Sequence, residues 1–192
     1  NTEQEKQNIK LFLRQMYSLG GNIAKPPVTD NGDLSTVGYA VEVMKWFKPT
    51  LTVVNLGAVD ACHANYTDYL RALHRADHAV GHIWNQVNQI PEMANNTIML
   101  VSPECGRNLS PNPIKDENDW KAFDHSDANT QRVFTQMVGP NVPSNLVRGG
   151  VGNQIGETAD NCPTIAEILG FKQDVMGTGL ISSTAQSLFD RI

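Results

Sequence analysis

The chain lacks several features that would assign it to a protein class directly. No apolar run approaches the roughly 20 residues that a membrane-spanning helix requires. The formal net charge is −5, so no excess of positive charge favours binding to nucleic acid or to an anionic membrane surface. There is no Gly-x-Ser-x-Gly nucleophile elbow, and the Gly-rich stretch that begins at Gly149 has no P-loop lysine. We therefore expect neither a membrane span nor a nucleic-acid partner.

Cysteine is also scarce. The chain has three cysteines, Cys62, Cys105 and Cys162, which is an odd number and too few for a disulfide framework. One disulfide with a free thiol and three free thiols are both compatible with the sequence, and the cellular compartment stays open. What the 192 residues do contain is 40% hydrophobic side chains, enough for one sizeable core or for part of a larger one.

Two short apolar runs organise the centre of the chain. Leu51–Leu56 and Thr97–Val101 are rich in β-branched residues and have the length of buried strands. Between them, Tyr66–Ile90 has the apolar periodicity of a long helix. Ligands of open α/β sheets bind outside the carboxyl ends of the strands. We therefore expect a site in the polar segments that follow the two runs.

The order of the expected elements predicts an α/β fold. Further helices are expected over Glu5–Leu19, from Ser35 or Thr36 to about Phe47, and over Pro163–Leu169, and a third strand over Val133–Val138. Helices alternating with strands are typical of a largely parallel sheet flanked by helices. We expect residues 1–192 to form a single α/β domain or a fragment of one. Its core should contain Val53, Val54, Leu56, Ile98, Leu100 and Val101.

Side chains that can bind a metal ion follow both runs. Asp60 and His63 are three residues apart in one turn, so both could reach a single ion, and His125 could join them from the long polar segment. Glu104 and Cys105 could serve a neighbouring ion. A structural interpretation stays open, because an Asp in a turn before a helix often acts as an N-cap or forms an Asx-turn.

The long helix carries further histidines. His74, His78 and His82 are spaced four residues apart, and histidines at this spacing can share a metal ion. No acidic residue accompanies them in the metalloprotease pattern, so we interpret them as one flank of the helix. Asp77 falls within the apolar stripe, where a carboxylate requires a polar partner.

Several segments, taken in order, carry a resemblance to a known family. They are Val59–His63, the helix from Tyr69 to Asp77, Pro103–Arg107, Asp124-His125, Gly139-Pro140 and Pro163–Gly170. Together they resemble the C-terminal half of the alkaline phosphatase superfamily, in the branch of sulfatases and nucleotide pyrophosphatases/phosphodiesterases, over residues 36–171. The resemblance implies an alkaline-phosphatase-like α/β fold of which this chain is the incomplete, C-terminal part.

The resemblance also implies the roles of the metal-capable residues. Asp60, His63 and His125 correspond to ligands of one zinc ion, in a turn that is one residue shorter than the family pattern. Glu104 and Cys105 stand where the Asp-His pair of a second metal ion belongs. In that family a Ser or Thr alkoxide attacks a phosphate or sulfate ester, and two metal ions stabilise the charge.

The family's nucleophile lies on an N-terminal segment to which none of the matched segments corresponds. We therefore expect no catalytic residue in this chain and no turnover by the chain alone. The expected partner is the N-terminal half of the same protein or a second copy of the chain. The compartment stays open, and the resemblance is compatible with a parent protein that is periplasmic or secreted in a bacterium.

Two alternatives stay open. The Glu-Cys pair in place of Asp-His favours a degenerate, non-catalytic relative with a binding or structural role. If the resemblance misleads, the chain is an unrelated α/β binding domain. The metal content of the purified protein separates a surviving metal site from a structural role of the turn residues.

Overall fold

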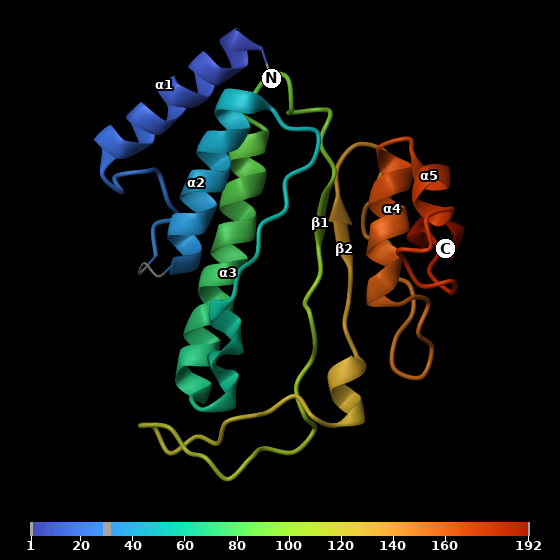
Figure 1. The fold of residues 1–192 in the computed structure, drawn as a ribbon. Coiled ribbons are helices and arrows are strands. Elements are labelled where there is room, and N and C mark those ends of the chain that lie inside the picture. Colours follow the sequence, from blue (N-terminus) through green and yellow to red (C-terminus); the bar gives the residue numbers. More distant parts are fainter. Residues whose placement is uncertain (1, 29–31, 192) are drawn as a thin grey trace. The chain divides into compact units, whose positions relative to one another are not determined.

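The computed structural model describes residues 2–28 and 32–191, and the chain forms two compact units (Figure 1). Unit 1 comprises Asn1–Thr97 and Leu109–Asp124. Unit 2 comprises Ile98–Asn108 and His125–Ile192. Unit 1 is built mainly of helices, whereas unit 2 combines a two-stranded sheet with helices.

Three helices form the frame of unit 1: α1 (Glu3–Leu19), α2 (Gly32–Phe47) and α3 (Tyr66–Val87). α1 begins with a capping box between Thr2 and Glu5 and ends at Gly20, whose φ of 55° is the left-handed conformation that glycine adopts without strain. The ring of Phe12 on α1 lies 5.2 Å from that of Phe47 at the end of α2. In the described part of the chain, no helix has the length and apolar composition needed to cross a membrane.

The core of unit 1 lies between α2 and α3. One cluster joins Val41 and Met44 of α2 to Val87, with Ile90 and Met93 after the end of α3. A second cluster joins Leu34 and Val37 of α2 to Ala79 of α3, and all three are fully buried. These residues recur at helical spacing, so each helix buries one apolar stripe against the other.

Unit 2 contains one sheet of two strands, β1 (Met99–Val101) and β2 (Gln136–Val138), and two helices, α4 (Asn161–Ile168) and α5 (Lys172–Met176). The strands are antiparallel, with Leu100 opposite Met137. A buried polar group, Asp160, lies at the N-terminal end of α4, and its carboxylate accepts hydrogen bonds from the backbone amides of Glu157 and Gln186 (2.8 Å each). These bonds tie the C-terminal segment to α4.

The predicted α/β fold with a largely parallel sheet is wrong. The described residues form only a two-stranded antiparallel sheet, and most of the regular structure is helical. A parallel pair requires a crossover connection, usually a helix. Between β1 and β2 the chain instead forms irregular structure with one 3₁₀ turn, Ala128–Gln131, and it returns antiparallel.

The expected strand over Leu51–Leu56 is also wrong. The segment belongs to no strand, and Val53 is 81% exposed instead of lying in the core. Val54 and Leu56 pack against the cluster of Leu34, Val37 and Ala79 instead. Ile98, Leu100 and Val101 are partly buried. The predicted helices are present, with ends that differ by only a few residues from the expected ones.

Candidate metal centre

Asp60 and His63 lie on η1, a 3₁₀ helix that spans Ala58–His63. Residues three apart are eclipsed in a 3₁₀ helix, so the two side chains project from the same side. His63 Nε2 lies 3.0 Å from Asp60 Oδ1. At its start, η1 is fixed by the Asp33 carboxylate, which accepts hydrogen bonds from the backbone amides of Gly57 (3.1 Å) and Ala58 (3.0 Å).

A loop of unit 1, residues 109–124, adds a second carboxylate. The backbone amide of Phe123 donates to the carbonyl of Cys62 (3.0 Å), and the Asn112 side chain donates to the carbonyl of His63 (3.0 Å). These bonds hold the end of the loop against η1. As a result, Asp124 Oδ1 lies 2.9 Å from His63 Nδ1.

The middle of this loop is bonded to the start of α3. Asp116 accepts hydrogen bonds from the backbone amide (2.8 Å) and hydroxyl (2.7 Å) of Thr67, and from the amides of Asn118 and Trp120. Partial burial raises the pKa of Asp116, but the hydrogen bonds from Thr67, Trp120 and Asn118 outweigh it and lower the pKa to about 2. The charged carboxylate therefore fixes the loop to the helix at neutral pH.

Both ring nitrogens of His63 lie within hydrogen-bond distance of a carboxylate oxygen. A neutral imidazole has one N–H, so it can donate to only one of the two carboxylates. The arrangement is satisfied in two ways. Either His63 is protonated and bonds both carboxylates, or one nitrogen binds a cation beside Asp60 while the other donates to Asp124.

His125 directly follows Asp124 in the chain and is exposed. Consecutive Cα atoms are about 3.8 Å apart, so the peptide bond itself keeps His125 beside Asp124. A nitrogen of His125, a nitrogen of His63 and an oxygen of Asp60 lie within 4.8 Å of one another. Among the described residues, this is the one group of three His, Cys, Asp or Glu side chains that comes so close.

This donor set fits a borderline divalent ion such as zinc. Two imidazoles and one carboxylate, with a water or substrate in the fourth position, are typical of catalytic zinc sites. Tetrahedral ligands about 2.1 Å from an ion are roughly 3.4 Å apart. Asp60 and His63 are already within this distance, so His125 needs to approach them by at most about 1.4 Å, which rotation about exposed χ angles allows.

The other predicted ligands belong to unit 2. Glu104 is exposed and Cys105 is partly buried, and neither is part of a three-residue metal-capable group among the described residues. Their assignment to a second ion stays a prediction. None of the three cysteines, Cys62, Cys105 and Cys162, forms a disulfide, which is one of the two alternatives that the sequence left open.

The histidines of α3 form no such group among the described residues. The rings of His74 and His78 are 4.6 Å apart on the exposed side of the helix. His78, His82 and Asp77 line a cavity of about 260 Å³. Burial, with a smaller effect of the Lys45 charge, lowers the pKa of His82. Asp77 is exposed, not buried in the apolar stripe.

Two features of the cluster differ from the sequence interpretation. Asn65, not Asp60, caps α3, accepting from the amide of Asp68 (2.8 Å), so the N-cap interpretation of Asp60 is wrong. The contact of Asp124 with His63 was missed, although an Asp beside a predicted ligand was a signal for it.

Comparison with protein-family models, with curated proteins and with solved structures finds no match for this chain. The resemblance to the alkaline phosphatase superfamily therefore stays a prediction.

Proposed function

We propose that this chain binds one divalent metal ion of the zinc class through Asp60, His63 and His125. The observation that supports the proposal is the position of His63 between two carboxylates, with a His125 nitrogen also close by. In metal sites the second nitrogen of a ligating histidine usually donates to a carboxylate, which fixes the tautomer and orients the ring. Asp124 is placed to do this for His63.

In this arrangement each residue has a distinct role. Asp60 supplies an anionic oxygen, and His63 and His125 supply neutral nitrogens. Asp124 accepts a hydrogen bond from the Nδ1–H of His63, which leaves Nε2 as the ligating atom. When bound, the ion would supply Lewis-acid polarisation of an ester oxygen.

We further propose that the metal centre belongs to a protein related to the phosphate and sulfate ester hydrolases, and that the chain alone binds without turnover. The sequence motifs that resemble this group supply metal ligands but no nucleophile. The alternative is a non-catalytic relative in which the same residues serve binding. It is favoured by Glu104 and Cys105, which stand in place of the Asp-His pair.

Metal content tests the proposal. Tag-free protein is purified without chelator, incubated with zinc, desalted and analysed by plasma mass spectrometry. We expect about one equivalent of zinc in the wild type and a loss of it in Asp60→Ala and His63→Ala. Matched controls are Asp68→Ala and His74→Ala, which replace exposed residues of the same types on α3 and should leave the zinc content unchanged.

The role of Asp124 gives a sharper criterion. Asp124→Asn keeps the shape of the side chain but weakens the acceptor, so zinc affinity should fall by about 10- to 100-fold in competition with a chromogenic chelator. No retained zinc in the wild type, or full retention in His63→Ala, would refute the metal centre. Zinc-dependent hydrolysis of a nitrophenyl phosphate or sulfate that Asp60→Ala abolishes would refute the absence of turnover.

A further inference from the structure

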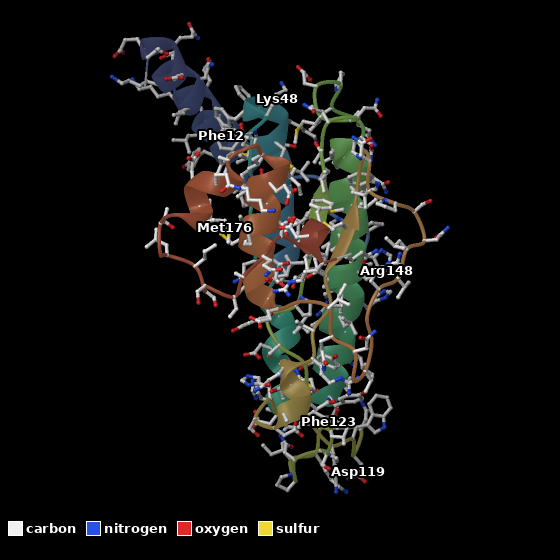
Figure 2. The ribbon with its side chains drawn as sticks, turned by 90° about the vertical axis from the view of Figure 1, so that its right-hand side faces the viewer. Phe12, Lys48, Asp119, Phe123, Arg148 and Met176 are labelled. Atoms are coloured by element: carbon white, nitrogen blue, oxygen red, sulfur yellow. The ribbon has the colours of Figure 1, made fainter. Side chains whose placement is uncertain are left out.

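The loop that carries Asp124 also forms an open aromatic groove. Residues 112–122 fold back on themselves: the amide of Ala122 donates to the carbonyl of Ile114 (2.9 Å), and that of Asn112 donates to the carbonyl of Ala122 (3.0 Å). The turn passes through Asp119, whose φ is 65°. Figure 2 shows Asp119 and Phe123 in this loop. The fold of the loop turns its side chains toward the start of α3.

Three rings line the groove. The centroid of Tyr66, at the start of α3, lies 5.9 Å from that of Trp120 and 5.6 Å from that of Phe123. The Tyr66–Trp120 pair is edge-to-face, at 69°. Trp120 is 48% exposed, so much of its surface is free to contact a ligand. The groove has a volume of about 610 Å³, within the range of small-molecule sites.

The charges beside the rings favour an anion. Two lysines line the groove with one carboxylate: Lys115 pairs with Asp119 at 2.6 Å. Lys121 is exposed, and in the part of the chain that the structure describes its ammonium group has no carboxylate within ion-pair distance. The groove therefore combines an apolar, aromatic surface with one positive charge that is not neutralised locally.

The groove is continuous with the metal cluster. Phe123 directly precedes Asp124, and its amide is bonded to the carbonyl of Cys62, which directly precedes His63. The aromatic surface thus adjoins Asp124 and His63 through Phe123 and Cys62, and these four residues belong to unit 1.

We propose that this groove binds a small molecule with an aromatic ring and an anionic group. The ring packs on Trp120 and Tyr66, and the acidic group pairs with Lys121. Binding of the ring does not require a metal ion at the centre. The statement that the groove holds the substrate of that centre rests on the function proposed above.

Nuclear magnetic resonance of ¹⁵N-labelled, chelator-treated protein tests the groove with 2-naphthyl phosphate as the probe. The indole N–H signal of Trp120, assigned with Trp120→Phe, should shift saturably with a Kd of about 1 mM or lower, while the signals of Trp46 and Trp84 stay in place. Trp120→Ala should weaken binding about three- to tenfold. Neutral 2-naphthol should bind more weakly than the phosphate.

Variants of Lys121 test the contribution of its positive charge to binding. Lys121→Met should weaken binding of naphthyl phosphate about two- to fivefold, with a smaller salt dependence than in the wild type, whereas Lys121→Arg retains the affinity. Lys10→Met, on the exposed side of α1, is the control. No saturable shift at Trp120, or equal affinity for naphthol and naphthyl phosphate, would overturn the proposal.

The proposals for the groove and for the metal centre can be refuted independently of each other. Asp60→Ala should remove zinc but leave naphthyl phosphate binding in chelator-treated protein unchanged. If the groove serves the centre, zinc should raise the affinity of the wild type for the probe and have no effect on Asp60→Ala. Probe binding without zinc binding would refute the metal centre alone, and zinc binding without probe binding would refute the groove alone.

Discussion

Asp160 offers the most direct test of what stabilises unit 2. Its carboxylate is fully buried and accepts hydrogen bonds from the amides of Glu157 and Gln186. It also forms an ion pair with Arg191, whose Nε lies 2.7 Å from Oδ2. The carbonyl of Asp160 accepts a further bond from the Thr164 hydroxyl, which in turn accepts from the amide of Leu188. Replacing Asp160 by alanine therefore leaves several donors without an acceptor.

The loss of folding free energy in Asp160→Ala follows from the buried ion pair and the hydrogen bonds that the substitution removes. Removing one partner of a buried ion pair typically costs about 3–5 kcal/mol. Each unsatisfied amide alone costs about 1–3 kcal/mol, but these terms are not additive, and water reaches part of the vacated site beside the partly exposed Arg191. We expect Asp160→Ala to destabilise unit 2 by about 3 kcal/mol. The isosteric Asp160→Asn should cost less, because the amide oxygen still accepts one of the bonds.

Amide hydrogen exchange is the appropriate assay. All three tryptophans and all four tyrosines belong to unit 1, so aromatic fluorescence does not report on unit 2. A loss of about 3 kcal/mol should raise the exchange rates of the Gln186 and Leu188 amides about a hundredfold. Asp174→Ala, an exposed carboxylate of α5, is the control and should change them little. Unchanged exchange at Gln186 in Asp160→Ala would refute the reasoning.

The same carboxylate predicts a pH dependence. Burial raises the pKa of Asp160, but the hydrogen bonds from Arg191 and from the amides of Gln186 and Glu157 outweigh it, so the pKa in the folded state is lowered. A group with a lowered folded pKa stabilises above its unfolded pKa, about 3.9 for Asp. The contribution should be complete above that pH and lost as the pH falls through the lower, folded pKa. Asp160→Ala should flatten the dependence.

Three other substitutions test unit 1 and the turn after β1. Leu34→Ala should destabilise unit 1 by about 3 kcal/mol in urea denaturation followed by tryptophan emission, because Leu34 is fully buried, whereas Leu13→Ala, 58% exposed, should cost under about 0.5 kcal/mol. Gly106→Ala should speed hydrogen exchange in unit 2, because the added Cβ would lie 2.9 Å from a backbone carbonyl oxygen. Asp116 should titrate near pH 2 in a carboxyl-detected experiment, and its contribution to stability, absent in Asp116→Ala, should disappear as the pH falls from about 4 through that value, since the bonds from Thr67 require the charged form.

The helices could be predicted because their signals are local. The apolar stripes of α2 and α3 recur at helical spacing, and the ends of α1 are marked by a capping box and by Gly20. The predicted strands over Thr97–Val101 and Val133–Val138 contain β1 and β2, but their antiparallel pairing could not be predicted, because a short apolar run does not specify its partner. Val54 and Leu56 satisfy their apolar character against α2 and α3, so the run needs no strand neighbour.

Part of the candidate metal centre could likewise be predicted from the sequence, and part of it could not. Asp60 and His63 could be paired from the sequence because three residues separate them, a spacing that one turn brings together. Asp124 lies beside the predicted ligand His125, but its contact with His63 spans 61 residues and depends on loop hydrogen bonds that no local pattern reveals. The sheet edge at which two strand ends were expected to bring the ligands together is absent from the residues that the structure describes.

A loop takes the place of that sheet edge, so the position of Asp124 at the candidate metal centre depends on a few loop hydrogen bonds. In a parallel sheet the ligands are positioned by many ladder hydrogen bonds. Here three contacts of the loop position Asp124. They are the Phe123–Cys62 and Asn112–His63 hydrogen bonds, and the bonds that the Asp116 carboxylate accepts from Thr67 at the start of α3. Each of these bonds is at a different point of the same loop, so the loss of one loosens the whole segment. The aromatic groove uses this loop as well, and a ligand that packs on Trp120 would stabilise the conformation that holds Asp124 against His63. Ring binding and metal binding should therefore reinforce each other through the loop, without requiring a contact between the two ligands.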